Sequence, residues 1–319
     1  MVDRASVQMP GLALQRRLFT CLISYTISGG RISALLTCLP GLNPAYLLSV
    51  ICLVTGRPMQ PKLLLFDVGN TSIKIGIADK EHILTSYSLP AQTEYSVDSL
   101  GLHLLSLLQH AAVSADTLTA CVASSVVPVL DPLLREAVVR YLHIPLYFAP
   151  DDLPIPLENR YQRPAEVGAD RLVGAYAARC LNPDSAGLLV IDFGTAVTFD
   201  CISGQAYEGG LIFPGPSTAL AALARHTAKL PKVNLVVSAQ EPVPGKDTMT
   251  SIQHGLVFGF VCMVEGLCSR LLRHLPRPAS VVATGGFARD IAKLSPVFDF
   301  VHPSLLLEGL RMLYFEQKG

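Results

Sequence analysis

The sequence predicts an α/β protein built from two similar lobes, with a ligand-binding cleft between them. The main observation is a pair of related stretches: residues 67–74 read Asp-Val-Gly-Asn-Thr-Ser-Ile-Lys, and residues 192–198 read Asp-Phe-Gly-Thr-Ala-Val-Thr. Each follows an apolar run and leads into alternating apolar residues, which is the pattern of a strand, a tight polar turn and a second strand. Strands also alternate with helical segments along the chain, as in α/β proteins. The repeated hairpin indicates internal duplication.

Composition excludes several classes of protein. At 319 residues the chain is long enough for two domains with a buried core, and half of its residues are apolar. The formal net charge is zero and no basic stripe or acidic tail occurs, so neither a nucleic acid nor a membrane is expected as a partner. The eight cysteines form no C-x-x-C pair. This favours free thiols in a reducing compartment, and hence a cytoplasmic protein, over a disulfide framework or a zinc site.

Residues 1–61 form an N-terminal extension of different composition. Asp3 is its only acid among several arginines, and residues 32–56 carry no charge. Pro40 interrupts this apolar stretch, so a clean membrane-spanning helix is not expected. The segment fits a transit peptide, and it also fits a translation start placed too far upstream, with Met59 just before the first strand. In either case we expect it to be poorly ordered or detached.

The first lobe is expected at residues 62–181. Ile73, Ile75 and Ile77 alternate along the second strand and form one apolar face. A proline-rich stretch at residues 151–164 is longer than most connections, which favours a binding role. Apolar residues at helical spacing predict the helices, and Pro128 marks the start of the helix at 128–139. In chain order the lobe is predicted to contain strands at 63–66 and 72–78, a helix at 97–112, a strand at 120–123, a helix at 128–139, a strand at 146–149 and a helix at 166–181.

The second lobe is expected at residues 182–319. The Asn-Pro-Asp sequence at 182–184 ends the preceding helix. A long amphipathic helix carries Gly255 and Gly259 four residues apart, a spacing that lets another backbone approach closely. In chain order the lobe is predicted to contain the second hairpin from Gly187, helices at 218–226 and 250–275, a strand at 281–283 followed by Thr284-Gly285-Gly286, and a closing helix at 304–315.

The first turn carries groups that can hold a metal-bound phosphate. Asp67 is suited to lie near Mg²⁺, directly or through water, because this ion takes few carboxylates and keeps several waters. Gly69 lets the backbone approach phosphate oxygens. Asn70 and Thr71 add hydrogen-bond donors, and Lys74 adds a positive charge. Such a turn alone also fits an ordinary hairpin, but its second copy favours phosphate binding.

The second turn repeats this chemistry without a lysine. Asp192, Gly194 and Thr195 follow the same pattern, and Thr198 adds another hydroxyl group. Hydroxyl groups must therefore bind the phosphate or a cation on this side. The glycines of residues 284–286 fit either a nucleoside packed on bare backbone or a turn without a ligand.

A third group of residues begins a helix directly after the long loop. Residues 166–171 read Glu-Val-Gly-Ala-Asp-Arg, which places Asp170 and Arg171 in the first helical turn. Free backbone N–H groups at that position favour anions. The arginine can bind a carboxylate with two hydrogen bonds, and the aspartate can accept a proton from a hydroxyl group. The same pair also fits an ordinary helix start with a solvated arginine.

Taken together, these residues resemble the type III pantothenate kinases, a branch of the acetate kinase, actin and sugar kinase superfamily. The matching motifs, in chain order, read DVGNTSIK, SSVVP, EVGADR, DFGTAVTFD, YEGGLIFPG, GKDT and ATGG. They lie within residues 62–316 and leave the N-terminal extension outside. The resemblance implies two ribonuclease H-like lobes of the actin-like ATPase superfamily, with the active site in the cleft between them. It also implies ATP-dependent phosphorylation of pantothenate to 4′-phosphopantothenate, the first committed step to coenzyme A.

The resemblance also implies roles for individual residues. Asp170 would be the general base, Asp67 would lie near Mg²⁺, and Asp192 would bind a monovalent cation, K⁺ or NH₄⁺. The residues implied to contact ATP are Asp67, Val68, Gly69, Asn70, Thr71, Ser72, Ile73, Lys74 and Thr195. The residues implied to hold pantothenate are Tyr161, Gly168, Ala169, Asp170, Arg171 and, across a homodimer interface, Thr248.

Two positions depart from the family pattern. Arg163 stands where relatives often have asparagine before the proline, and Gly174 replaces another frequent asparagine. Both bear on substrate affinity more than on reaction type. The alternatives are a non-catalytic regulatory homologue, similar to the transcription accessory factors described in this family, and another small-molecule kinase of the superfamily. The retained Asp67, Lys74 and Asp170 favour an active kinase.

Overall fold

A computed structural model describes residues 19–27, 30–38, 61–91, 94–226, 233–235 and 239–319. The chain divides into two compact units, Met1–Met59 and Gln60–Gly319. In the first unit, β1 (Phe19–Ile27) pairs antiparallel with β2 (Gly30–Cys38), two strands that the sequence patterns do not predict. The expected poor order of the rest of this extension, and a start at Met59, fall on residues outside the described ranges.

The first sheet of the second unit is built from β3 (Lys62–Val68), β4 (Ser72–Ala78), β5 (Ile83–Pro90), β6 (Leu118–Ser125) and β7 (Leu146–Ala149). Their order across the sheet is β5-β4-β3-β6-β7. β4 runs antiparallel to β3 and β5, whereas β6 is parallel to β3 and β7 is parallel to β6. The almost continuous burial of β3 is typical of a central strand that is covered on both faces.

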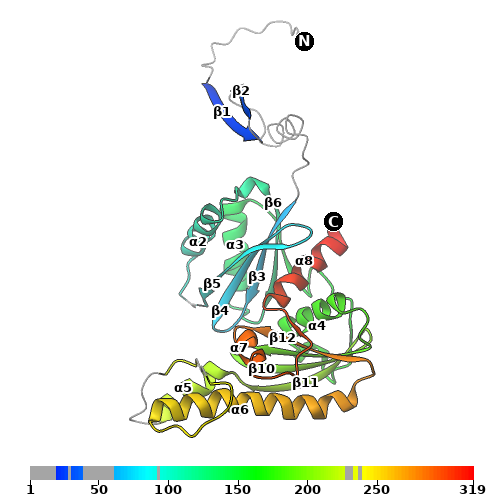
Figure 1. Ribbon diagram of the computed structural model, residues 1–319. Coiled ribbons are helices and arrows are strands. Elements are labelled where there is room, and N and C mark those ends of the chain that lie inside the picture. The colour runs from blue at the N-terminus through cyan, green and yellow to red at the C-terminus, as the bar shows by residue number, and fades with distance from the viewer. Residues whose placement is uncertain (1–18, 28–29, 39–60, 92–93, 227–232, 236–238) are drawn as a thin grey trace, which may run out of the picture. The chain divides into compact units, whose positions relative to one another are not determined.

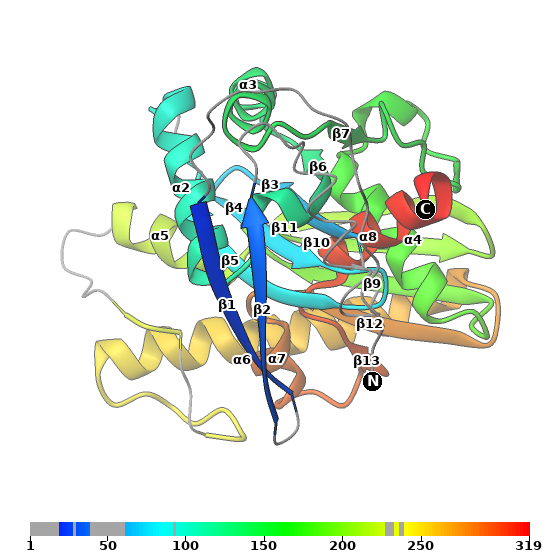
Figure 2. The same ribbon diagram turned by 90° about the horizontal axis from the view of Figure 1, so that it is seen from above.

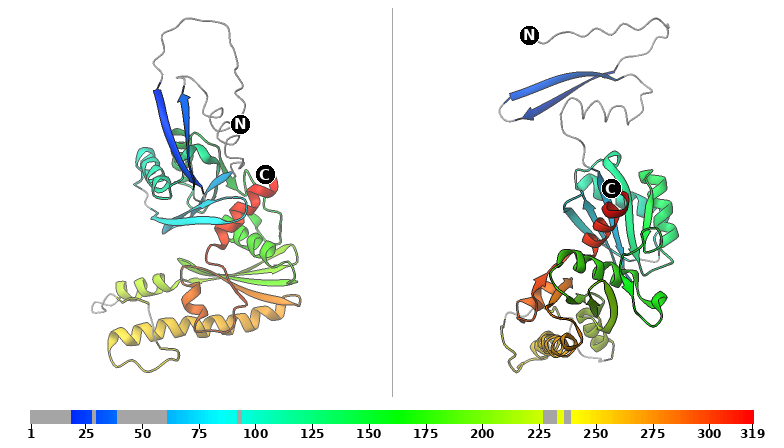
Figure 3. Two further views of the ribbon diagram at one scale, coloured as in Figure 1. Left: turned by 45° about the horizontal axis from the view of Figure 1, so that its top comes forward. Right: turned by 90° about the vertical axis from the view of Figure 1, so that its right-hand side faces the viewer.

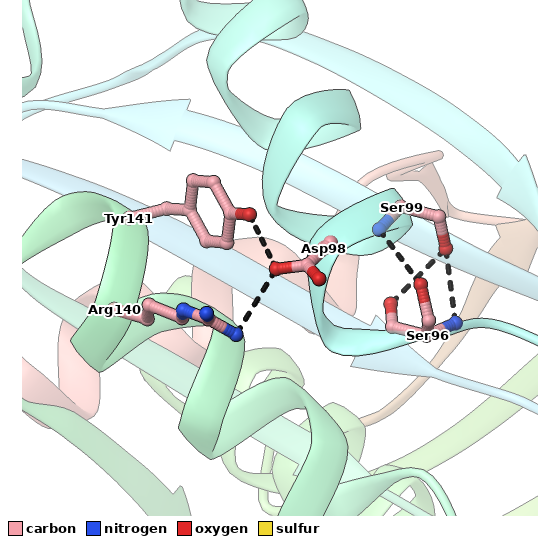
Figure 4. A network of polar contacts seen from close by, with 5 residues as sticks. All are labelled: Ser96, Asp98, Ser99, Arg140 and Tyr141. Carbon is pink, nitrogen blue, oxygen red and sulfur yellow. Dashed lines mark hydrogen bonds and ion pairs between the residues drawn. The ribbon is translucent and has the colours of Figure 1, made fainter.

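One face of this sheet is covered by α2 (Val97–His110) and α3 (Asp131–Leu142) (Figure 1). A polar network links the two helices at the surface (Figure 4). Asp98 of α2 accepts a hydrogen bond from the Tyr141 hydroxyl at 2.5 Å and lies 3.1 Å from Arg140 in an ion pair. Ser96 and Ser99 form a reciprocal capping box that satisfies free N–H groups at the start of α2.

The second sheet is built from β8 (Glu158–Asn159), β9 (Gly187–Phe193), β10 (Ala196–Ser203), β11 (Ala206–Pro214), β12 (Ala279–Gly285) and β13 (Phe300–Val301). Its order is β13-β12-β9-β10-β11-β8. β10 is antiparallel to β9 and β11, while β12 is parallel to β9 and β13 is parallel to β12. Apart from the short edge strand β8, this sheet repeats the first one strand by strand. The predicted fold class of two similar α/β lobes is therefore confirmed, and the matching strand orders agree with the repeated hairpin in the sequence.

The long helix α6 (Thr248–Leu271) runs along the second sheet, with α5 (Pro216–His226) beside it and α7 (Ala288–Ala292) on the same face (Figures 1 and 2). All buried residues of α6 lie at or beyond Val257, and its first half extends past the sheet (Figure 3). With the short helix η3 (Leu272–His274), α6 forms the one described helix that is long and apolar enough to cross a membrane, judged by length and composition alone. Only 33% of its most apolar stretch is buried.

Two helices lie side by side between the sheets, α4 (Ala169–Leu181) and α8 (Leu305–Lys318) (Figures 1 and 3). Val173 of α4, Leu310 of α8 and Leu65 of β3 belong to one buried hydrophobic cluster. Ala178 of α4 belongs to a second cluster, together with Val190 of β9. The last helix of the chain thus returns to the first sheet, and α4 contacts the cores of both lobes. This packing fixes the start of α4 at the junction of the lobes.

Candidate active site

A cavity of about 1120 Å³ lies between the two lobes. Its walls come from the β3–β4 turn, the β9–β10 turn, β11, the end of β12, and helices α4 and α5. The structure brings together all three groups of residues singled out in the sequence. Ten of the predicted site residues line this cavity: Asp67, Gly69, Asn70, Thr71, Ser72, Lys74, Asp170, Arg171, Asp192 and Thr195.

The β3–β4 turn holds a lysine and an aspartate next to each other. Asp67 and Lys74 are paired across the hairpin, and the Lys74 Nζ atom lies 3.3 Å from the Asp67 Oδ2 atom. The Gly69 amide donates a hydrogen bond of 3.0 Å to the Ser72 carbonyl, which closes the turn. The turn therefore presents one cation and a set of backbone and side-chain donors to the cavity.

The charges of this pair depend on their surroundings. Burial raises the pKa of Asp67, and the neighbouring Lys74 opposes part of this rise. For Lys74, burial alone would lower the pKa, but Asp67, Asp192 and Asp170 outweigh it, so the pKa is raised. The ammonium group consequently stays protonated at neutral pH, in the field of three carboxylates.

The β9–β10 turn is held from the start of α5. The Thr195 carbonyl accepts hydrogen bonds from the Gly215 amide at 2.9 Å and from the Thr218 hydroxyl at 2.6 Å. The hydroxyl groups of Thr71 and Thr195 lie 2.9 Å apart and share a hydrogen bond. This contact joins the two turns across the cavity.

Asp192 has an unsatisfied oxygen. Its Oδ1 atom is buried and has no hydrogen-bond partner among the described residues. Burial raises the pKa of Asp192 to about 7, with Lys74 opposing the rise and three neighbouring aspartates adding to it. Gly285, at a φ of +92°, leaves room for this carboxylate, because a Cβ atom there would lie 2.3 Å from Oδ1. A buried carboxylate oxygen without a donor is suited to a cation.

The start of α4 places Asp170 and Arg171 at the cavity wall. Gly168 is the residue before the helix, and a Cβ atom there would lie 2.5 Å from the Asp170 Oδ1 atom. That oxygen accepts a hydrogen bond of 2.8 Å from the Arg171 amide. Burial raises the pKa of Asp170, while the Arg171 amide and its charge oppose the rise. A raised pKa makes this carboxylate a better proton acceptor near neutral pH.

Arg171 is bound by Asp200, an aspartate for which the sequence patterns predict no role. The Arg171 Nε atom donates a hydrogen bond of 2.8 Å to the Asp200 Oδ1 atom. The Tyr207 hydroxyl donates to the same oxygen, and the Thr198 hydroxyl donates to Oδ2, both at 2.8 Å. The sequence did contain a signal for a role of Asp200. Thr198 and Asp200 share one face of an otherwise apolar strand, and an acid buried there needs hydrogen-bond or charge partners.

Six predicted site residues do not line the cavity: Val68, Ile73, Tyr161, Gly168, Ala169 and Thr248. Val68 and Ile73 face the core, with 1% and 3% exposure, so they can offer a ligand only backbone groups. The Tyr161 ring lies 6.5 Å from the Tyr207 ring. Thr248 is exposed at the start of α6 and lines a separate hollow of about 640 Å³.

The cavity also has an apolar side and a further cation. Ile212 and Phe213 of β11 line it with 65% and 43% of their surfaces exposed, and Phe287 before α7 joins them. Exposed apolar side chains in a cavity suit a flat apolar group such as a nucleobase. Arg225 of α5 also lines the cavity. No local pattern distinguishes these residues from ordinary strand and helix positions.

Comparison with known proteins shows the family to which the chain belongs. The model of the family "Type III pantothenate kinase" matches residues 63–270. A type III pantothenate kinase from Desulfovibrio desulfuricans is 67% identical over 260 residues, which cover 82% of this chain and 99% of that protein. The chain belongs to the type III pantothenate kinase family. Members from Nitratidesulfovibrio vulgaris and Lawsonia intracellularis are 56% and 47% identical and cover 82% and 79% of this chain, and 99% and 95% of their own lengths.

Solved structures resemble the chain more distantly. A glucomannokinase that uses inorganic polyphosphate or ATP, from Arthrobacter, has a TM-score of 0.44 and 15% identity, covering 81% of this chain and all of that one. A candidate Baf family transcriptional activator from Campylobacter jejuni has a TM-score of 0.49 and 18% identity, covering 79% of this chain and 98% of that one. Likeness at this level carries no argument about function.

The charges of the cavity fit the divalent cation that a kinase of this family needs. Four carboxylates line it against three cationic side chains, and ATP adds further negative charge. The described residues contain no cluster of three or more side chains that could hold a metal ion alone. Mg²⁺ in phosphotransferases is commonly held by one or two carboxylates together with phosphate oxygens and water. Asp67, which lines the cavity next to Lys74, is one carboxylate of this kind.

Proposed function

We propose that this protein transfers the γ-phosphoryl group of ATP to the primary hydroxyl group of pantothenate. The product is 4′-phosphopantothenate, in the pathway to coenzyme A. Membership of the type III pantothenate kinase family supports this reaction. Within the molecule, the proposal is carried by one observation: Asp170 and Arg171 line the same cavity as both phosphate-type turns. Pantothenate offers a carboxylate to the arginine and a hydroxyl group to the aspartate.

The ATP phosphates would lie along the β3–β4 turn. Asn70, Thr71 and Ser72 provide donors there, and Thr195 faces them from the second lobe within 2.9 Å of the Thr71 hydroxyl. Lys74 stays protonated and adds positive charge. Mg²⁺ bound near Asp67 would neutralise phosphate charge during the transfer. Positioning and charge neutralisation account for most of phosphoryl-transfer catalysis.

Pantothenate would occupy the end of the cavity at the start of α4. Asp170 would accept the proton of the attacking hydroxyl group, and its raised pKa suits that role. Arg171 would bind the carboxylate. Gly168 and Ala169 would contribute backbone at the helix start, where free N–H groups favour an anion, and Tyr161 lies nearby.

A monovalent cation, K⁺ or NH₄⁺, is assigned to Asp192. The buried Oδ1 atom without a donor supports this assignment. The residue belongs to the turn of the second lobe, which carries no lysine, whereas Lys74 pairs with Asp67 in the first. A bound cation would therefore take the place that the lysine occupies in the other turn.

A homodimer is proposed through α6. The first half of this helix extends beyond the second sheet, and Met249 is 46% exposed there (Figure 3). Thr248 begins the same helix and lies outside the cavity of its own chain. A second copy packed along α6 would cover this apolar surface and could bring Thr248 to the partner's pantothenate.

A cytoplasmic location is proposed from the cysteines. The five cysteines described in the second unit are free thiols: Cys121, Cys180, Cys201, Cys262 and Cys268. Free thiols persist in a reducing compartment, where disulfides are rare.

The reaction is tested by the rate of pantothenate phosphorylation by the full chain, with and without Mg²⁺ and K⁺. We expect turnover that requires both ions. Asp170→Asn should lower kcat by about 10²–10⁴-fold, because it removes the proton acceptor while keeping the side-chain volume. Asp98→Asn is the matched control, since Asp98 lies in the α2–α3 network outside the cavity. Absence of turnover by folded wild-type protein would refute the proposal, and an Asp170→Asn variant as fast as wild type would remove Asp170 from its role.

A further inference from the structure

Arg171 meets the cavity with one edge of its guanidinium group already occupied. Its Nε atom donates to Asp200 Oδ1 at 2.8 Å, and its Nη2 atom lies 2.7 Å from the same oxygen as an ion-pair contact. The two side chains are only 9% and 3% exposed. A bidentate arginine–carboxylate contact to a substrate must therefore use the opposite edge of the guanidinium group.

The opposite edge is free to bind. The buried Nη2 atom carries two N–H groups, and apart from its ion-pair contact with Asp200 it makes no hydrogen bond with any described residue. An unsatisfied buried N–H group is costly, so this atom is suited to an acceptor supplied by a ligand. Gly210 keeps space around it, because a Cβ atom there would lie 3.0 Å from Nη2 and 1.7 Å from the Phe199 carbonyl oxygen.

Asp200 is itself fixed by groups that leave it no alternative orientation. The hydroxyl of Tyr207, a residue with 0% exposure, and the Thr198 hydroxyl donate to its two oxygens at 2.8 Å. The Arg171 guanidinium also lies over the Tyr207 ring, 5.8 Å from its centre. Arg171 is thus held by a charge on one side and by an aromatic face on another.

We propose that Asp200 is a positioning residue for the acceptor substrate: with Tyr207 and Thr198 it orients Arg171 so that the free edge of the guanidinium binds the carboxylate of pantothenate. This inference rests on the proposed function, because pantothenate is the ligand assigned to Arg171 there. It makes Asp200 part of substrate recognition although no atom of Asp200 touches the acceptor. The arrangement selects an acceptor that carries a carboxylate at one end.

Asp200 could instead compete with pantothenate for Arg171, and the two roles predict opposite changes in KM for pantothenate when Asp200 is removed. If Asp200 competed with the substrate for Arg171, its removal would free the guanidinium and lower KM for pantothenate. If it positions Arg171, its removal lets a long, flexible side chain sample several rotamers, and KM rises. The geometry favours positioning, because Asp200 contacts the edge formed by Nε and Nη2 and leaves the edge formed by Nη1 and Nη2 for a ligand.

The test compares wild type, Asp200→Asn and Tyr207→Phe with two acceptors. One acceptor is pantothenate, and the other is pantothenol, in which a hydroxymethyl group replaces the carboxylate. Asp184→Asn, an exposed substitution in the same lobe, is the control. We expect Asp200→Asn to raise KM for pantothenate about 10- to 100-fold, with KM for ATP nearly unchanged, as for loss of hydrogen bonds to a charged group. Tyr207→Phe keeps the charge and removes one donor, so a rise of about 2- to 10-fold is expected.

The preference for pantothenate over pantothenol should fall by the same factors, since pantothenol makes no contact that depends on the charge of Arg171. An unchanged or lowered KM for pantothenate overturns the proposal. Equal losses of kcat with both acceptors, at unchanged KM, also overturn it, because they indicate a structural role alone. If Asp200→Asn does not fold, Tyr207→Phe decides in the same way. No turnover of pantothenate by wild type refutes the proposed function itself, which distinguishes that failure from this one.

Discussion

Replacing Asp192 by asparagine should stabilise the cation-free protein and abolish its response to K⁺. The carboxylate has a pKa of about 7, against an ordinary value of 3.8, because it is buried. A rise of about 3 pH units corresponds to about 4 kcal/mol, at about 1.36 kcal/mol per unit. This is an upper figure, since part of the residue is open to the cavity. Asparagine has a similar volume and carries no charge to desolvate.

The sign of the pH dependence follows from the raised pKa. A carboxylate whose pKa is raised by folding contributes most to stability below its unfolded value, and this contribution is lost as the pH rises through the folded value. For Asp192 the window runs from 3.8 to about 7. Wild type should therefore lose up to about 4 kcal/mol relative to Asp192→Asn across that window, and the difference should level off above it.

The assay is urea unfolding of both proteins in buffers that contain only tetramethylammonium as cation, repeated after addition of K⁺. K⁺ should raise the free energy of unfolding of wild type above pH ~7, because it binds the folded carboxylate, and should leave the variant unchanged. Parallel pH curves for the two proteins would refute the reasoning. So would an equal stabilisation of both by K⁺.

Three further substitutions give independent tests. Gly285→Ala should cost about 1–3 kcal/mol of stability, measured by urea unfolding, because the residue has a φ of +92° and its Cβ would lie 2.3 Å from Asp192 Oδ1; a neutral effect would contradict this. Gly174→Ala should stabilise α4 by about 0.5–1 kcal/mol, since no atom lies within 4 Å of the new Cβ, and a lowered melting temperature would count against it. Thr71→Val removes the 2.9 Å contact with Thr195 and should change stability by less than about 1 kcal/mol while raising KM for ATP several-fold; an unchanged KM for ATP would remove the Thr71 hydroxyl from phosphate binding.

The repeated hairpin was the most predictable part of the fold. Apolar runs, alternating apolar residues and a polar turn identify β3–β4 and β9–β10, because strand periodicity is local and each copy supports the other. The same locality explains why Asp67 and Lys74 could be expected side by side. Their spacing on either side of a short turn makes them cross-strand neighbours.

Residues whose partners are distant in sequence could not be predicted in this way. The Arg171–Asp200 pair joins a helix start to a strand of the second sheet, and nothing in either local pattern specifies the other. The return of α8 to the first sheet is of the same kind, since an amphipathic stripe shows that a helix is buried but not against what. The strand pair β1–β2 lies in a segment that composition alone marks as unusual.

The protein is proposed to phosphorylate a carboxylate-bearing acceptor, pantothenate, in this cavity. The most direct measurement is mass spectrometry of the products after incubation of the full chain with ATP, Mg²⁺, K⁺ and an equal mixture of pantothenate, N-acetylglucosamine and N-acetylmannosamine. We expect a single phosphorylated product, 4′-phosphopantothenate, formed in equal amount to ADP. Phosphate found on a sugar, or ADP formed without any phosphorylated pantothenate, would contradict it.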